Sequence, residues 1–221
     1  MTDGGKRGRF IAFEGGEGAG KSTQAKLLAD ALRSRGISVD VTREPGGTAG
    51  AEAIRHLLLH PPGEEGDAGW GARAEALLFA AARADHVERR IRPAMDNGTW
   101  VVCDRFVDSS RAYQGGAGGL GDEAITALHN FGSRGLRPDL TILLEVDPDQ
   151  VEERLAIRDG DEVDAIGGRS SEYHRNVAAC FNALAKADPK GFAVIDGSGD
   201  ADAVHAEVLK ALEPLFESSA A

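Results

Sequence analysis

The sequence has little cysteine and no long apolar run, and it has no excess of basic residues. Its two cysteines, Cys103 and Cys180, lie far apart, and the first falls within an apolar run, so we expect no disulfide framework and a cytoplasmic location. No apolar run approaches the roughly 20 residues that cross a bilayer. Residues 2–9 are polar and lack the apolar segment of a secretory signal. We therefore predict no membrane partner.

A net charge of −11 argues against a general nucleic-acid surface, because such surfaces replace counterions with clustered lysines and arginines. Any phosphate-bearing ligand must therefore be held by a few well-placed cations. A chain of 221 residues can bury a substantial core. The chain shows no internal repeat and no linker, so we expect residues 1–221 to form a single domain.

Residues 15–22 read GGEGAGKS and match the phosphate-loop pattern G-x-x-x-x-G-K-S/T at every fixed position. A short glycine-rich pattern can match by chance, but here an apolar run at residues 10–13 precedes it and a helical pattern follows it. In this strand–loop–helix setting, backbone N–H groups surround phosphate oxygens at the positive end of a helix. Lys21 can then reach the β- and γ-phosphates, and the Ser22 hydroxyl can ligate Mg²⁺.

A second acidic position follows another apolar strand pattern. Residues 100–103 are apolar and run into Asp104, which is the layout of an acid that orients Mg²⁺ near a phosphate loop. Arg105 lies at the same sheet edge. A strand-end aspartate is otherwise usually a helix cap, but together with Lys21 and Ser22 it is better explained as part of a catalytic site.

Residues 72–96 form the longest helical pattern. At about 100° per residue, Phe79, Arg83 and His86 fall on one helix face. They could form a platform for a flat heterocycle, which would stack on the ring and accept hydrogen bonds from the guanidinium. The alternative is a semi-exposed aromatic with two solvated polar neighbours, and this helix alone favours that alternative.

Apolar strand patterns alternate with helical patterns along the chain. Strands are expected near residues 10–13, 37–41, 100–103, 140–144 and 192–195. This alternation predicts right-handed βαβ units and an α/β fold with a parallel sheet of about five strands flanked by helices.

Five stretches together resemble one family, the bacterial thymidylate kinases. They come in the family's order and read GGEGAGKS at 15–22, TREPGGT at 42–48, EALLFAAARADH at 75–86, CDRFVDSSRAYQGG at 103–116 and RPDLTILLEV at 137–146. The resemblance implies a P-loop NTPase fold with a short flexible lid at about residues 154–170. It also implies Mg²⁺-dependent transfer of the ATP γ-phosphoryl group to dTMP, giving dTDP, and a homodimer.

The resemblance also assigns site residues. Those expected to bind ATP are Gly15, Gly16, Glu17, Gly18, Ala19, Gly20, Lys21, Ser22 and Thr23, with Ser22 and Asp104 supporting the metal. Those expected to bind dTMP are Glu44, Pro45, Arg55, Phe79, Arg83, Arg105, Ser110, Tyr113 and Gln114. Among them Phe79 would stack on thymine, Arg105 would grip the acceptor phosphate with help from Arg43, and Tyr113 would pack against the sugar. The residues expected to be catalytic are Lys21, Glu17, Asp104, Arg105 and Arg158.

The lid departs from the family pattern. Bacterial members usually carry D-R-x-E there, but this chain has Asp164, Ala165, Ile166 and Gly167, without the arginine. Three nearby arginines could replace the missing cation, namely Arg154, Arg158 and Arg169. We favour Arg158 because it lies at the lid's entry and shares a helix face with Arg154.

Two other functions compete with this interpretation. One is a different P-loop nucleotide kinase or a deoxynucleoside kinase, although the set around Phe79 and Ser110 argues against a purine acceptor. The other is a GTPase-like switch, in which hydrolysis times a partner interaction. A switch would be supported by a guanine-reading N-K-x-D stretch, and the sequence contains none.

Overall fold

The computed structural model of the protein describes residues 7–61, 69–146 and 170–220. The strands are β1 (Phe10–Glu14), β2 (Val39–Arg43), β3 (Trp100–Asp104), β4 (Leu140–Glu145) and β5 (Phe192–Asp196). The helices are α1 (Lys21–Ser34), α2 (Ala49–Leu59), α3 (Ala72–His86), α4 (Arg92–Asp96), α5 (Val107–Ser110), α6 (Asp122–Ser133), α8 (Ser171–Ala187) and α9 (Ala201–Ala220), with π-helical turns η1 (Val87–Ile91) and η2 (Arg111–Ala117).

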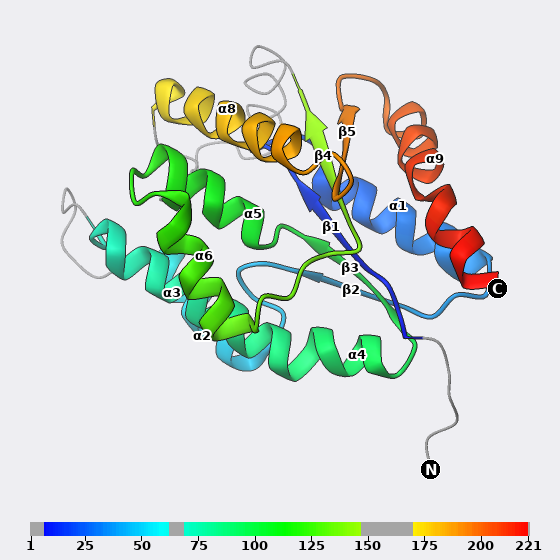
Figure 1. Ribbon diagram of the computed structural model, residues 1–221, viewed down its shortest axis with the longest axis horizontal. Helices are drawn as coiled ribbons and strands as arrows, with labels where there is room; N and C mark the ends of the chain where they lie inside the picture. Colours follow the sequence, from blue (N-terminus) through cyan, green and yellow to red (C-terminus); the bar gives the residue numbers. More distant parts are fainter. Residues whose placement is uncertain (1–6, 62–68, 147–169, 221) are drawn as a thin grey trace.

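The five strands form one parallel sheet in the order β2-β3-β1-β4-β5 (Figure 1). The expected α/β fold with about five parallel strands is therefore confirmed. Because every neighbouring pair is parallel, all five strands end at the same edge of the sheet. Ligands of open α/β sheets bind beyond this carboxyl edge.

Helices cover both faces of the sheet, with α1 and α9 on one side (Figure 1). In β1, the side chains of Ile11 and Phe13 pack in the same core as α1 and α9. The side chains of Phe10 and Ala12 pack in the opposite core with η1 and α4. A strand covered on both faces is apolar at every position, which explains the near-continuous apolar runs in the sequence.

The helical pattern over residues 72–96 is continuous but not uniform. It runs as α3, then widens through η1 and resumes as α4. Pro93 is the physical cause, because its ring lacks an N–H and would clash with the carbonyl of Arg89 in a regular helix. The wider turn keeps the chain helical, so Val87 and Ile91 still reach the core.

The ends of β1, β2 and β3 are fixed relative to one another by their register. Asp104 pairs with Phe13 on one side and with Arg43 on the other. The segments that follow these three strands therefore begin side by side at one edge. They are the phosphate loop, the loop starting at Glu44, and the segment starting at Arg105.

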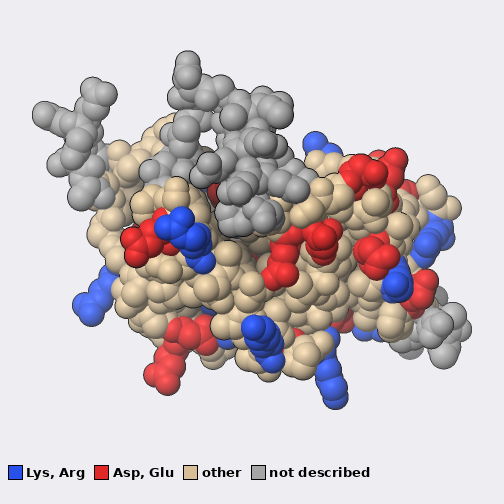
Figure 2. Space-filling model, turned by 90° about the horizontal axis from the view of Figure 1, so that it is seen from above, with Lys and Arg blue, Asp and Glu red and all other residues tan. Residues whose placement is uncertain are grey.

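On the face shown in Figure 2, the lysines and arginines of the described residues form no continuous basic patch. Lysines and arginines there are interspersed with aspartates and glutamates. No helix in the described part of the chain is long and apolar enough to cross a membrane.

Candidate active site

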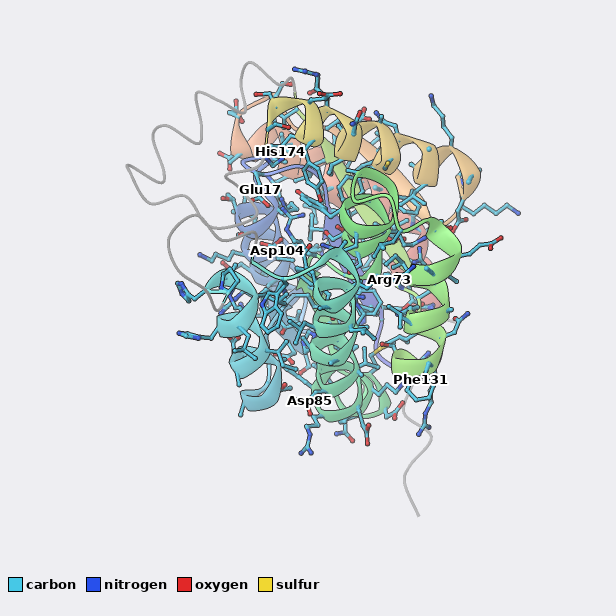
Figure 3. The ribbon with its side chains drawn as sticks, turned by 90° about the vertical axis from the view of Figure 1, so that its left-hand side faces the viewer. Glu17, Arg73, Asp85, Asp104, Phe131 and His174 are labelled. Carbon is cyan, nitrogen blue, oxygen red and sulfur yellow. The ribbon has the colours of Figure 1, made fainter. Side chains whose placement is uncertain are left out.

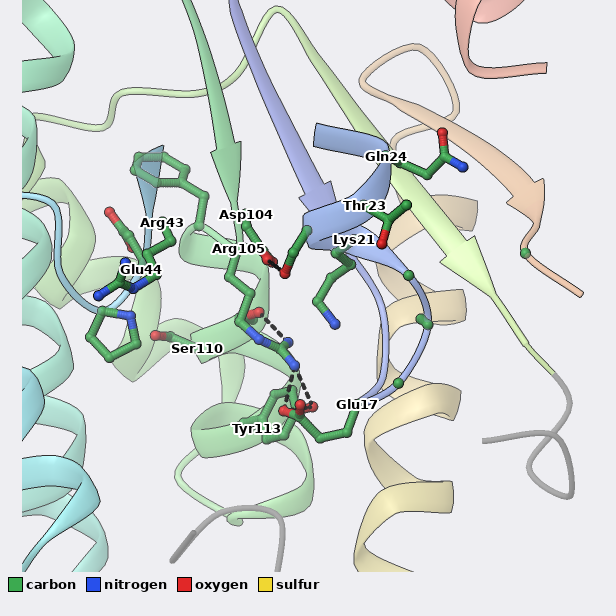
Figure 4. Close-up of a pocket in the computed structure, with 18 of the residues that line it drawn as sticks. Glu17, Lys21, Thr23, Gln24, Arg43, Glu44, Asp104, Arg105, Ser110 and Tyr113 are labelled. Atoms are coloured by element: carbon green, nitrogen blue, oxygen red, sulfur yellow. Dashed lines mark hydrogen bonds and ion pairs between the residues drawn. The ribbon is translucent and has the colours of Figure 1, made fainter. Parts of the chain in front are cut away.

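A cleft of about 630 Å³ opens at the carboxyl edge of the sheet (Figure 4). It brings together most of the residues that the sequence singles out. From the phosphate loop and the start of α1, the lining residues are Glu17, Gly18, Ala19, Gly20, Lys21, Ser22 and Thr23. From the rest of the chain they include Arg43, Glu44, Pro45, Arg55, Phe79, Arg83, Asp104, Arg105, Ser110, Tyr113 and Gln114.

The phosphate loop turns tightly between β1 and α1. Gly15 has a φ of 137°, and a Cβ there would lie 2.4 Å from the carbonyl oxygen of Leu144. Gly20, with a φ of 89°, directly precedes the first residue of α1. A side chain would clash at Gly15 and would be strained at Gly20, so these glycines allow the loop to turn back on the helix N-terminus. That terminus offers unpaired N–H groups and a partial positive charge to an anion.

Lys21 is the first residue of α1 and is 6% exposed. Its Nζ donates to the carbonyl oxygen of Gly16 at 2.5 Å. Burial, together with the charge of Arg105, lowers the pKa of Lys21 to about 8, while Glu17 and Asp104 oppose the shift. The ammonium is thus a desolvated cation with a loop carbonyl as partner, a setting in which phosphate oxygens are favourable ligands.

Two oxygen donors of the kind that Mg²⁺ binds come from neighbouring elements. The Ser22 hydroxyl at the start of α1 donates to the Asp104 carboxylate at the end of β3. Hydroxyl and carboxylate oxygens beside a phosphate site are the ligands that Mg²⁺ takes in proteins. These residues therefore fit the metal that the sequence implies.

Arg105 connects the phosphate loop with α5 and η2 (Figure 4). One terminal nitrogen donates to Glu17 Oε1 at 2.5 Å, and the other donates to the Gly15 carbonyl at 3.1 Å and the Ser109 hydroxyl at 3.0 Å. Its guanidinium also contacts the Tyr113 hydroxyl at 3.3 Å. Burial opposes the charge, but nearby Glu17, Tyr113 and Asp104 raise the pKa of Arg105 above its usual value.

Glu17 and Asp104 both lie on the side of the molecule that faces the viewer in Figure 3, which is the left-hand side of Figure 1.

Tyr113 is 4% exposed, and burial raises its pKa to about 12, so its phenol keeps its proton throughout the neutral range. The carboxylate of Glu17 accepts from both Arg105 and Tyr113. A single carboxylate from the phosphate loop therefore holds two side chains from the opposite wall of the cleft.

A second network surrounds Arg83, which is 3% exposed. Its Nε donates to Glu44 at 2.7 Å, and its Nη2 donates to the Ser110 hydroxyl at 2.8 Å. The other Glu44 oxygen lies 3.0 Å from His86 Nδ1, and His86 Nε2 lies 2.8 Å from the Thr42 hydroxyl. Burial alone would raise the pKa of Glu44, but Arg83 and His86 hold it below its usual value.

This network decides between the two interpretations of the α3 face. Phe79 is 9% exposed, His86 is fully buried, and Phe79 and Arg83 both line the cleft. The alternative of a semi-exposed aromatic with two solvated neighbours is therefore wrong. The reason is that α3 packs against α2 on one side and α6 on the other, which places this face inward.

The remaining predicted acceptor residues are held by local contacts. Arg55 donates to the Pro45 carbonyl at 3.0 Å. Gln114 donates to Glu75 at 2.8 Å, which ties η2 to the first turn of α3. Arg43 donates to both oxygens of Glu52. Gly15 and Gly16 do not line the cleft, and they act instead through their carbonyls, which hold Arg105 and Lys21.

Sequence reasoning missed part of the lining, namely Gln24, Leu59, Phe106, Ser109, Gly197, Gly199, Ala201 and Val204. Gly197 and Gly199 lie between β5 and α9, and Ala201 and Val204 lie at the start of α9. This part of the chain carries no motif. Ser109 directly precedes Ser110, which was predicted to bind the substrate, and this proximity was the signal that could have identified it. The lid was predicted at about residues 154–170, and only Ser170 of it lies within the described residues. Arg154, Arg158, Arg169 and the run from Asp164 to Gly167 lie outside them.

The Glu44–Arg83 pair gives a stability prediction. Removing one partner of a buried ion pair leaves an uncompensated charge, so Glu44→Gln should lower the free energy of unfolding at pH 7 by about 3–5 kcal/mol. The folded pKa of Glu44 lies below its usual 4.5, so its contribution is present above pH 4.5 and is lost as the pH falls. Urea unfolding at several pH values measures both effects.

The matched control is Asp30→Asn. Asp30 pairs with Arg33 on the exposed side of α1, and the side chains are 73% and 54% exposed. Such a pair contributes about 0–1 kcal/mol. Equal losses in the two variants at pH 7, or a Glu44→Gln loss that does not shrink on acidification, would contradict the buried-pair interpretation.

Comparisons with known proteins agree with this geometry. The family model described as thymidylate kinase matches residues 13–208. A thymidylate kinase from Rhizorhabdus wittichii is 54% identical over 209 residues, covering 95% of this chain and 99% of the relative, and one from a Bradyrhizobium species is 45% identical over 97% and 94%. The crystal structure of thymidylate kinase from Ehrlichia chaffeensis superposes with a TM-score of 0.76 at 33% identity, covering 94% of this chain and all of that one. The chain therefore belongs to the thymidylate kinase family, whose members are ATP:dTMP phosphotransferases.

Proposed function

We propose that this chain transfers the γ-phosphoryl group of ATP to dTMP within the cleft, and that the residues assigned below perform the reaction. The observation that carries this proposal is the contact between Glu17 and Arg105. This contact joins the phosphate loop, which would hold the donor, to Arg105 on the opposite wall, so that two phosphate-bearing ligands would meet between Lys21 and Arg105. A cleft that bound ATP alone would not need Arg105 in addition to Lys21.

On the donor side, the backbone N–H groups of residues 17–23 and the ammonium of Lys21 would hold the ATP phosphates. Ser22 and Asp104 would hold Mg²⁺, which when bound supplies charge neutralisation at the phosphates. Bound phosphate would also favour the charged form of Lys21, offsetting the effect of burial on its pKa.

On the acceptor side, Arg105 would hold the dTMP phosphate, with Arg43 and Arg55 contributing positive charge. Phe79 would stack on the thymine ring over the floor formed by Pro45. Arg83, Ser110 and Gln114 would donate to or accept from the polar edge of the base. Tyr113 would pack against the sugar where a 2′-hydroxyl would project. Glu44 acts on the base through Arg83, because both of its oxygens are already bonded to Arg83 and His86.

The transfer itself requires little covalent chemistry from the protein. An oxygen of the dTMP phosphate attacks the γ-phosphorus of ATP, and the bond from that phosphorus to the bridging oxygen of ADP breaks. Lys21 and Arg105 stabilise the charge on the transferring group, while the fixed walls of the cleft keep donor and acceptor aligned.

We expect ADP release by purified protein with Mg²⁺ and ATP to depend strongly on dTMP. The nucleotide dUMP lacks one methyl group, so it should be weaker by about tenfold or more. Added singly, dCMP, dGMP, AMP and thymidine should stimulate little, because they lack the base edge or the phosphate that Arg83 and Arg105 would bind. A coupled ADP assay checks the panel.

The same panel separates the alternatives. Stimulation by thymidine or by a purine nucleotide would contradict the acceptor pocket and indicate another P-loop nucleotide or deoxynucleoside kinase. Hydrolysis of the nucleotide without any acceptor would favour the GTPase-like switch over a kinase.

The missing lid cation gives a second prediction. We propose that Arg158 replaces it, so Arg158→Ala should lower kcat by about a thousandfold, because arginines that stabilise the transferring group have effects of this size. Arg169→Ala and Arg154→Ala are the matched controls and should retain most of the turnover. Steady-state kinetics decide, and full turnover in Arg158→Ala with loss in Arg169→Ala would contradict the assignment.

We also propose a homodimer formed through α3 and α6. Phe131 on α6 is 91% exposed and points away from the body of the protein (Figure 3), and Leu77 on α3 is 56% exposed. The two helices are close neighbours, since a Cβ at Gly132 would lie 3.2 Å from Ala84. Large exposed apolar side chains on adjacent helices support a surface that a second copy would cover.

Phe131→Glu should therefore convert a dimer to a monomer, because a carboxylate would have to be buried without a partner. Light scattering after size exclusion measures the mass. The control is Val194→Glu, which places the same charge at a half-exposed position on the edge strand β5. A wild-type monomer, or a Phe131→Glu variant that remains dimeric, would contradict this interface.

A further inference from the structure

The backbone at Arg105 is held in a left-handed conformation. Its φ is 69°, which is uncommon for a residue with a side chain and carries a conformational cost. Two hydrogen bonds fix the turn, from Arg105 N to the Phe13 carbonyl at 2.9 Å and from Phe106 N to Glu14 Oε1 at 2.8 Å. Both acceptors belong to the end of β1, so this strand determines how Arg105 leaves β3.

Glu14 is fully buried directly before the phosphate loop. Its carboxylate accepts three hydrogen bonds, from Phe106 N, from Ser109 N at 3.0 Å, and from the Ser109 hydroxyl at 2.6 Å. Burial, together with the charge of Asp108, raises the pKa of Glu14 to about 7. A carboxylate in this position is costly to keep charged, so stability alone does not explain it.

The Ser109 hydroxyl links this carboxylate to Arg105. It donates its one hydrogen to Glu14 Oε2, which leaves its oxygen lone pairs to accept from Arg105 Nη1 at 3.0 Å. Glu14, Ser109 and Arg105 thus form a directional chain of hydrogen bonds. Apart from the Tyr113 hydroxyl, the other partners of the guanidinium, Glu17 and the Gly15 carbonyl, belong to the phosphate loop.

The next residue, Ser110, serves the other arginine. Its hydroxyl accepts from Arg83 Nη2 at 2.8 Å. Two consecutive serines of α5 therefore orient two different guanidinium groups, one at each end of the acceptor pocket. Substituting Ser109 or Ser110 by alanine therefore removes the same hydroxyl from one guanidinium or from the other.

We propose that Glu14 and Ser109 are positioning residues that set the orientation of Arg105 and thereby the affinity for the phosphate group of the acceptor. This inference rests on the proposed function, in which Arg105 holds the phosphate of dTMP. Without Ser109, the guanidinium keeps Glu17, Gly15 and Tyr113 as partners and is drawn toward the donor loop. The base end of the pocket, held by Ser110, would not change.

Titration calorimetry with dTMP and with thymidine tests this directly. The ratio of the two dissociation constants measures what the phosphate contributes in each protein. We expect Ser109→Ala to bind dTMP about tenfold more weakly, the size expected for one hydrogen bond to a charged group, and to bind thymidine as the wild type does. Ser110→Ala should weaken both ligands alike and leave the ratio unchanged.

Glu14→Gln is the second variant, because its amide would donate to the Ser109 hydroxyl and compete with Arg105 for the same lone pairs. It should shift the ratio in the same direction as Ser109→Ala. Thermal unfolding confirms which variants are folded, and either folded variant provides the test. A wild-type ratio in a folded variant, or equal weakening of both ligands, would overturn the inference. If the wild type bound thymidine as tightly as dTMP, the proposed phosphate site itself would fail.

Discussion

The placement of the Arg105 guanidinium between the phosphate loop and α5, with its side chain 16% exposed, is the constraint on which the site depends. A charge removed from water is tolerated only when its donors are paired, and this one is paired with the loop, α5 and η2 at once. These partners come from three different segments at the carboxyl edge of the sheet. The position of one cation therefore fixes the relative placement of the phosphate loop and the opposite wall of the cleft.

The same principle acts at the other end of the cleft. Arg83 is held by Glu44 and Ser110, and Glu44 is held in turn by His86. Buried ion pairs contribute little net stability compared with apolar packing, but they specify geometry strongly. The pocket is thus defined by two guanidinium groups whose orientations are determined independently. The two ends of the cleft are therefore organised by separate parts of the chain.

The sheet makes these networks possible. Parallel pairing brings the ends of β1 and β3 together, so that Glu14 and Asp104 lie at one edge although they are distant in sequence. The covering helices exclude water from both faces and leave this edge as the place where polar groups meet. The left-handed turn at Arg105 is maintained because its neighbours on β1 accept the hydrogen bonds of the turning chain.

The sequence by itself determined the elements and the motif, because strand and helix periodicity and the glycines around Lys21 are local properties. It predicted the sheet class, the phosphate loop, and which side chains share the face of α3 with Phe79. It could not determine which face of α3 is covered, since spacing gives relative direction but not the neighbour that packs there. Nor could it show that Glu14, 95 positions before Ser109, would orient a third residue. Only the tertiary structure decided these points. A buried charge needs hydrogen-bond partners, and it is the fold, not the local sequence, that brings those partners within reach.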